Sequence, residues 1–186
     1  MTHPTKPSAR AESRAGAAAT PRKSAGPEAT ALLRADHKRV SDLFEAYEHT
    51  RSTAKKKTLV AEICKELGVH AQVEEEIFYP AVKAALRDKE LVPEATVEHA
   101  TLKELIAQVE GQEPGGEMFD ARIKVMSEYV KHHVKEEHTE MFPKAKATSL
   151  DMHELGARIA ARKEELLATW PPGAAQPVAQ AVDAVA

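Results

Sequence analysis

The chain has 186 residues, which is enough for one well-buried domain with tails. Charged residues make up 30% of it and aromatic residues only 4%, and this composition favours helices, because sheets depend on β-branched and aromatic side chains. The formal net charge of -3 gives no sign of the basic surface that a nucleic-acid-binding protein needs, so we expect no nucleic-acid partner.

The single cysteine and the hydropathy of the chain further restrict the class of protein. Cys64 is the only cysteine, which excludes an intrachain disulfide and a cysteine-based metal cage and fits a reducing, cytoplasmic compartment. No apolar run approaches the ~20 residues that a membrane span requires, and the start of the chain has no apolar segment typical of a secretory signal. We therefore expect a cytoplasmic protein without a membrane partner.

Apolar residues recur with helical spacing along the middle of the chain. Pro80 is expected to kink or end the second of these helices, and the glycine-rich stretch 111–116 separates the third helix from the fourth. The third helix is expected to start near residue 93 or 94, and the others are expected at about 28–50, 54–86, 117–145 and 149–169.

This pattern predicts an all-α fold, an up-down-up-down four-helix bundle with an additional C-terminal helix. Both ends of the chain are rich in Ala and Pro and lack apolar periodicity, so they are expected to be disordered. The predicted segments are a disordered tail at 1–27, the bundle at 28–145, the C-terminal helix at 146–170 and a second disordered tail at 171–186.

The strongest signal in the sequence is an internal repeat. Each half has a histidine on one helix, followed on the next helix by His-x-x-x-Glu and then by an aromatic residue and a proline. The residues are His37, His70, Glu74 and Tyr79-Pro80 in the first half, and His99, His133, Glu137 and Phe142-Pro143 in the second. Two helical hairpins related by a pseudo-two-fold axis are therefore expected.

The repeated polar residues lie on apolar stripes. On the first helix, Leu33, His37, Val40 and Phe44 are separated by steps of four, three and four residues, so they share the face that points to the core. The same register holds on the other three helices. The sequence therefore directs four imidazoles and two carboxylates inward.

Burying such groups without partners is costly, because an isolated ionised carboxylate in an apolar core costs several kcal/mol or becomes neutral. A pair of divalent cations would compensate the charge. Imidazole with carboxylate suits iron, manganese or zinc, and the lack of thiolates argues against an iron–sulfur cluster. The alternative is a purely structural network of hydrogen-bonded core residues. Six inward groups in a duplicated arrangement favour the metal interpretation.

Together these motifs resemble the hemerythrin-like HHE cation-binding domain, over about residues 28–145. The resemblance implies a bundle with an oxo- or hydroxo-bridged pair of non-haem irons. Carried over residue by residue, it makes Glu74 and Glu137 bridging ligands, with His37 and His70 on one iron and His99 and His133 on the other.

One position departs from the oxygen-carrying members of that family. They have a further histidine one turn after the third-helix ligand, where this chain has Lys103. The set of four histidines and two glutamates instead resembles the di-iron proteins of the family that are linked to repair of iron centres under nitrosative stress. A site with fewer protein ligands leaves coordination positions open for a small molecule.

Two functions remain open at this point. The first is a binding or sensing module for oxygen, nitric oxide or iron, and the second is a di-iron enzyme acting on peroxide or nitric oxide, in detoxification or in repair of iron centres. Both need the same ligands, so the sequence assigns no catalytic residue. The oligomeric state is left open as well. A ferritin-like oxidase is disfavoured, because that fold uses Glu-x-x-His rather than His-x-x-x-Glu.

Overall fold

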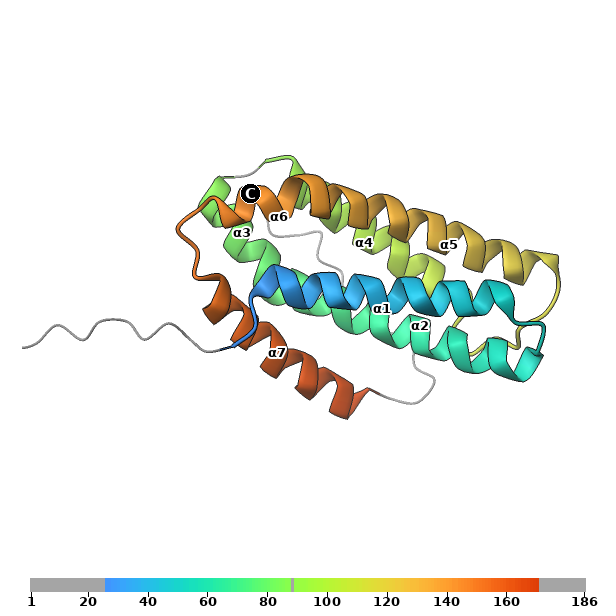
Figure 1. Ribbon diagram of the computed structural model, residues 1–186. Coiled ribbons are helices and arrows are strands. Elements are labelled where there is room, and N and C mark those ends of the chain that lie inside the picture. Colours follow the sequence, from blue (N-terminus) through green and yellow to red (C-terminus); the bar gives the residue numbers. More distant parts are fainter. Residues whose placement is uncertain (1–25, 88, 171–186) are drawn as a thin grey trace, which may run out of the picture.

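The computed structural model describes residues 26–87 and 89–170, and every regular element in these ranges is a helix. Four long helices run along one axis (Figure 1). They are α1 (Ala29–His49), α2 (Thr53–Val73), α4 (Leu91–Ala107) and α5 (Glu117–Glu136). The predicted all-α bundle is confirmed. The predicted tails lie outside the described residues, apart from Gly26 and Pro27.

Side-chain caps explain where several helices begin. Glu28 accepts a hydrogen bond from the backbone N–H of Thr30 at the start of α1, and Ser52 accepts one from Lys55 at the start of α2. These oxygens satisfy N–H groups that have no partner within the first helical turn. Gly116, with φ of 79°, precedes α5 in a backbone conformation that other residues rarely adopt.

The second and fourth helices do not end at their prolines. A π-helical turn, η1 (Glu74–Phe78), joins α2 to α3 (Tyr79–Leu86), and a second one, η2 (Glu137–Met141), joins α5 to α6 (Phe142–Lys146). Each wide turn starts at the glutamate of the repeat and precedes the aromatic–proline pair. The expectation that Pro80 might end its helix is therefore wrong, because the widened turn accommodates a residue that lacks a backbone N–H.

The fifth predicted helix is α7 (Met152–Thr169), which packs along α1 and α2 on the side away from α4 and α5 (Figure 1). Its Gly156 lies where the chain enters α1, since a Cβ built there would be 1.9 Å from the carbonyl oxygen of Pro27. Lys163 of α7 forms an ion pair with Asp36 of α1. The helix therefore covers one flank of the bundle and leaves the opposite flank to α4 and α5.

The apolar core consists of two clusters with a polar layer between them. One cluster includes Leu33, Phe78 and Ile159 and involves α3, α6 and α7, and the other includes Phe44, Ile63 and Met126 and lies toward the opposite end of the bundle. The histidines and glutamates of the repeat occupy the register between the clusters. No helix among the described residues is long and apolar enough to cross a membrane.

Candidate metal centre

All six residues of the repeat are buried in the layer between the apolar clusters. The most exposed, His37, retains 7% of its accessible surface, and Glu74 retains none. They divide into two groups whose nitrogen and oxygen atoms converge, and Glu74 belongs to both. The groups are His37, His70, Glu74 and Glu137, and Glu74, His99 and His133. The histidines fall into the two pairs that the family resemblance implied, whereas Glu137 belongs to the first group only.

Within each group the imidazoles face one another through Nε2. The two Nε2 atoms are 2.9 Å apart in the pair His37 and His70, and 3.2 Å apart in the pair His99 and His133. Ligands bound at about 2.0–2.2 Å to one metal ion lie roughly 3.0–3.5 Å from each other. The nitrogen–nitrogen distances therefore match the edge of a coordination polyhedron.

Each carboxylate lies between histidines of both halves. Glu74 Oε2 is 3.1 Å from His70 Nε2 on the same helix and 3.4 Å from His99 Nε2. Glu137 Oε2 is 3.2 Å from His37 Nε2 and 3.8 Å from His133 Nε2. The pattern repeats about the pseudo-two-fold axis, and it is the arrangement required of carboxylates that bridge two ions.

The outer nitrogens of two histidines face carboxylates that immediately precede a histidine of the repeat. His133 Nδ1 donates a hydrogen bond of 2.6 Å to Glu98, and His70 Nδ1 lies 3.6 Å from Asp36. A carboxylate at Nδ1 orients the ring so that Nε2 is free to bind a metal. Asp36 and Glu98 directly precede His37 and His99 in the sequence, and the sequence analysis assigned neither carboxylate a function.

The other two histidines have unlike outer partners. His99 Nδ1 lies 3.2 Å from Glu75, whose carboxylate also accepts hydrogen bonds of 2.7 Å from Lys103. His37 Nδ1 lies 2.8 Å from His138 Nε2. Lys103, which stands where oxygen-carrying relatives would have a histidine, thus reaches the centre only through Glu75.

Tyr79 is a further residue of the site whose contacts the sequence did not predict. Its buried hydroxyl donates a hydrogen bond of 2.9 Å to Glu137, and it also lies 3.3 Å from Glu74 and 3.2 Å from His99 Nε2. In the other half the corresponding residue is Phe142, which stacks on the His37 ring at 6.0 Å between centroids. The signal was present as the aromatic–proline pair, but an aromatic residue at that position is usually part of the core.

The buried charges of the cluster shift the pKa values of its members in different directions. Burial alone would lower the pKa of His70, but the charges of Glu74 and Asp36 raise this pKa to about 10. Glu98 likewise raises the pKa of His133 against the effect of burial. The pKa of Glu137 is lowered by the surrounding histidines, although its burial opposes this. The raised pKa values favour protonated His70 and His133 beside the carboxylates, and a metal ion bound here would have to displace those protons.

The donor set also contains polar atoms that the protein leaves unsatisfied. Glu74 Oε1 and Glu137 Oε2 are buried and accept no hydrogen bond. Such atoms are expensive in a core, where most buried polar groups are paired. Together with the converging Nε2 atoms, they fit a pair of imidazole- and carboxylate-bound cations.

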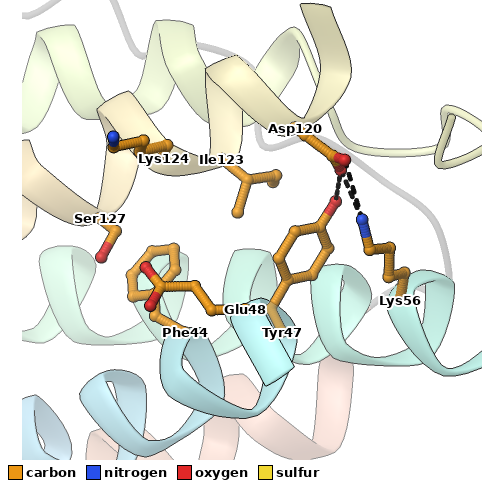
Figure 2. Close-up of a pocket in the computed structure, with 8 residues that line it drawn as sticks. All are labelled: Phe44, Tyr47, Glu48, Lys56, Asp120, Ile123, Lys124 and Ser127. Atoms are coloured by element: carbon orange, nitrogen blue, oxygen red, sulfur yellow. Dashed lines mark hydrogen bonds and ion pairs between the residues drawn. The ribbon is translucent and has the colours of Figure 1, made fainter. Parts of the chain in front are cut away.

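A separate pocket lies between α1, α2 and the first half of α5, where Tyr47 and Lys56 both contact Asp120 (Figure 2). Its volume is about 390 Å³, and Ser127 at its edge has a buried hydroxyl without a hydrogen-bond partner. None of the six residues of the repeat lines this pocket. It is therefore not the mouth of the candidate metal centre.

The fold and the site define a class of protein, a four-helix bundle whose core holds a cluster of histidines and glutamates able to bind cations. The profile of the Hemerythrin HHE cation binding domain matches residues 28–145. The chain belongs to this family.

Two known proteins are similar to the chain. A DNA nickase of Nostoc sp. strain PCC 7120 is 28% identical over 111 residues, which are 60% of this chain but only 31% of the nickase. The chain thus matches less than a third of that relative. The crystal structure of a hemerythrin HHE cation binding domain-containing protein from Mycobacterium kansasii superposes with a TM-score of 0.64 at 23% identity, and covers 75% of this chain and 87% of that chain. This structural likeness shows the shared fold.

Proposed function

We propose that the chain is a dinuclear non-haem iron protein that binds or senses a small ligand such as oxygen or nitric oxide. The observation that carries the proposal is the double convergence of Nε2 atoms onto two carboxylates, each of which contacts histidines of both halves. His37 and His70 would hold one ion, His99 and His133 the other, and Glu74 and Glu137 would bridge them.

The donor set supports iron. Imidazole and carboxylate suit a non-haem iron, and a bound iron supplies Lewis acidity together with redox chemistry. Two imidazoles and two shared carboxylates would leave positions on each bound ion open to an external molecule. Lys103 would not fill one, because its ammonium group is paired with Glu75.

The protein's own side chains orient the four histidines and bury the centre away from water. Glu75, Glu98 and His138 contact the outer nitrogens of His99, His133 and His37 within hydrogen-bonding distance, and Asp36 lies 3.6 Å from the outer nitrogen of His70. The Tyr79 hydroxyl is the one phenol beside the bridging carboxylates among the described residues, and burial together with the charges of Glu74 and Glu137 raises its pKa well above the ordinary value. It therefore stays protonated and can donate a hydrogen bond to a carboxylate or to a bound ligand.

The test is a titration of anaerobically iron-loaded protein with nitric oxide, followed by optical absorption and electron paramagnetic resonance. We expect new bands that saturate at a fixed number of ligands per chain and are absent from metal-free protein. Spectra identical to those of free ferrous iron with nitric oxide would contradict the proposal. Adding peroxide and measuring oxygen release distinguishes the enzyme alternative, which requires turnover above that of free iron.

A further inference from the structure

The two flanks of the candidate metal centre are unequal although the repeat makes its interior symmetrical. On the first flank, Val69 and Val73 precede His70 and Glu74 in the sequence and are fully buried in the cluster that includes Ile159 of α7. On the second flank, the corresponding positions, which precede His133 and Glu137, are His132 and Glu136. Where the first flank has two buried valines, the second flank thus has a histidine and a glutamate, side chains of types that can bind metal.

These side chains gather around Glu98. His132 Nε2 lies 3.3 Å from Glu136 Oε1 and 3.8 Å from Glu98 Oε1, and the other oxygen of Glu98 accepts the 2.6 Å hydrogen bond from His133. His132 is 61% exposed, whereas Glu98 is almost buried. Glu98 therefore connects a surface group of three possible ligands with a histidine of the dinuclear centre.

The carboxylates of this group contact histidines but no lysine or arginine among the described residues. On the first flank Asp36, the counterpart of Glu98, is paired with Lys163 of α7. Within the described ranges, no ion pair joins a lysine or arginine to Glu98 or to Glu136, although Lys131 and Lys135 are exposed on the same helix. Two carboxylates and an imidazole that no lysine or arginine engages offer ligand atoms to a cation.

A narrow crevice lies between α4 and α5 beside this group, lined by Glu98 and Glu136 but not by His132. Glu94 and Glu136 line its outer part and Glu98, His133 and Glu137 its inner part. Glu137 Oε2, at the inner end, is buried and accepts no hydrogen bond. The volume of the crevice is about 10 Å³, which is about the space of one water molecule. A hydrated ion cannot pass, so an ion using this route must exchange its waters for the carboxylates that line it.

We propose that Glu98, His132 and Glu136 form a third, surface site for a divalent metal ion, through which ions reach the dinuclear centre by way of Glu98. The delivery of ions to the dinuclear centre rests on the function proposed above, whereas the surface site itself does not. The site is transient, since only Glu98 is held by a further partner, and it supplies the centre from the flank that α7 leaves uncovered.

Cobalt uptake tests the route. Wild-type protein and the Glu136→Gln and His132→Gln variants are mixed with Co²⁺ alone, and the visible absorption of bound cobalt is followed by stopped flow. We expect the uptake rate constant to fall roughly tenfold in both variants while the final amplitude is unchanged. Glu128→Gln removes a carboxylate from the same helix that is more exposed than Glu136 and lies outside the proposed site, so it is expected to leave the rate constant unchanged. Equal rate constants in all four proteins would overturn the route.

Manganese broadening tests the site itself. The imidazole proton signals of zinc-loaded protein are recorded during addition of Mn²⁺ alone, and the His132 signal is assigned by its loss in His132→Gln. Selective broadening of His132 at low Mn²⁺, weakened in Glu136→Gln, is expected. If the dinuclear centre does not bind metal, the wild-type protein will show no cobalt bands, which distinguishes that failure from failure of the surface site. Broadening of His132 in that protein would still support the surface site, and a sharp His132 signal would overturn it.

Discussion

At the scale of single residues, the hydroxyl of Tyr79 stabilises carboxylates that would otherwise face one another in the core. Its hydrogen bond to Glu137 is 2.9 Å long. We expect Tyr79→Phe to lower the free energy of unfolding of the metal-free protein by about 1–3 kcal/mol, because a buried carboxylate loses a donor. Urea denaturation measures this, with Tyr129→Phe, a half-buried tyrosine of α5, as the control. A stability equal to that of the wild type would contradict the assigned contact.

The histidines set the pH dependence of the metal-free protein. The pKa of His70 is raised from 6.5 to about 10, so the stability it contributes is full below pH 6.5 and is lost as the pH rises toward 10. The pKa of His37 is lowered from 6.5, by burial and by the charge of His70, and that of His138 is lowered to about 4 by burial and by His37. Their contribution is lost as the pH falls below 6.5.

We therefore expect the metal-free protein to be most stable near pH 6.5 and to lose on the order of a few kcal/mol toward pH 10. Urea denaturation across this range measures the change, with metal-loaded protein as the comparison. Loaded protein should show little loss on the alkaline side, because its imidazoles are already deprotonated. A metal-free stability that rises steadily between pH 6.5 and 10 would contradict the charge assignment.

At the scale of elements, the close contact between α7 and the chain entering α1 determines whether a larger residue at Gly156 stabilises or destabilises the protein. Replacing glycine by alanine at an open helical position stabilises a protein by roughly 1 kcal/mol. At Gly156 the new Cβ would meet the backbone of Pro27 and Ala29, so we expect Gly156→Ala to destabilise the protein by about 1–3 kcal/mol. Urea denaturation checks the sign. Gly115→Ala, where a Cβ meets nothing within 4 Å, is the control. Stabilisation by Gly156→Ala would contradict the packing of α7.

The helices and the inward histidines could be predicted because their signal is local. Polar residues such as His37 and His99 interrupt an apolar stripe in register, and the register alone directs them to the core. The structure confirms the bundle and brings the six predicted residues together. Their binding of iron remains a prediction.

Features that depend on a wider turn or on tertiary contacts could not be predicted. In an α-helix Tyr79 would lie about 140° around the axis from Glu74, five residues earlier. The π-helical turn η1 brings position i+5 over position i, and so the hydroxyl faces the carboxylates. The outer partners of the histidines and the flank covered by α7 depend on how separate helices meet, which no local period reveals.

At the scale of the whole molecule, the relation to a DNA nickase invites a direct comparison of activity. The aligned part is less than a third of that relative, and this chain has 26 basic against 29 acidic residues. Without an excess of basic residues, binding to the phosphate backbone is weak. We expect no conversion of supercoiled plasmid to nicked circles, by gel electrophoresis, at protein concentrations where a nuclease control cuts completely. Accumulation of nicked circles would refute this expectation.

The central claim, two metal ions per chain bound by duplicated ligands, is tested most directly by elemental mass spectrometry after anaerobic ferrous loading and desalting. Wild type, His70→Ala, His133→Ala and the control His49→Ala, an exposed histidine at the end of α1, are compared. We expect about two irons per chain in the wild type and the control, and a clear loss in both ligand variants. Wild-type protein without bound iron would contradict the account, as would ligand variants that retain it fully.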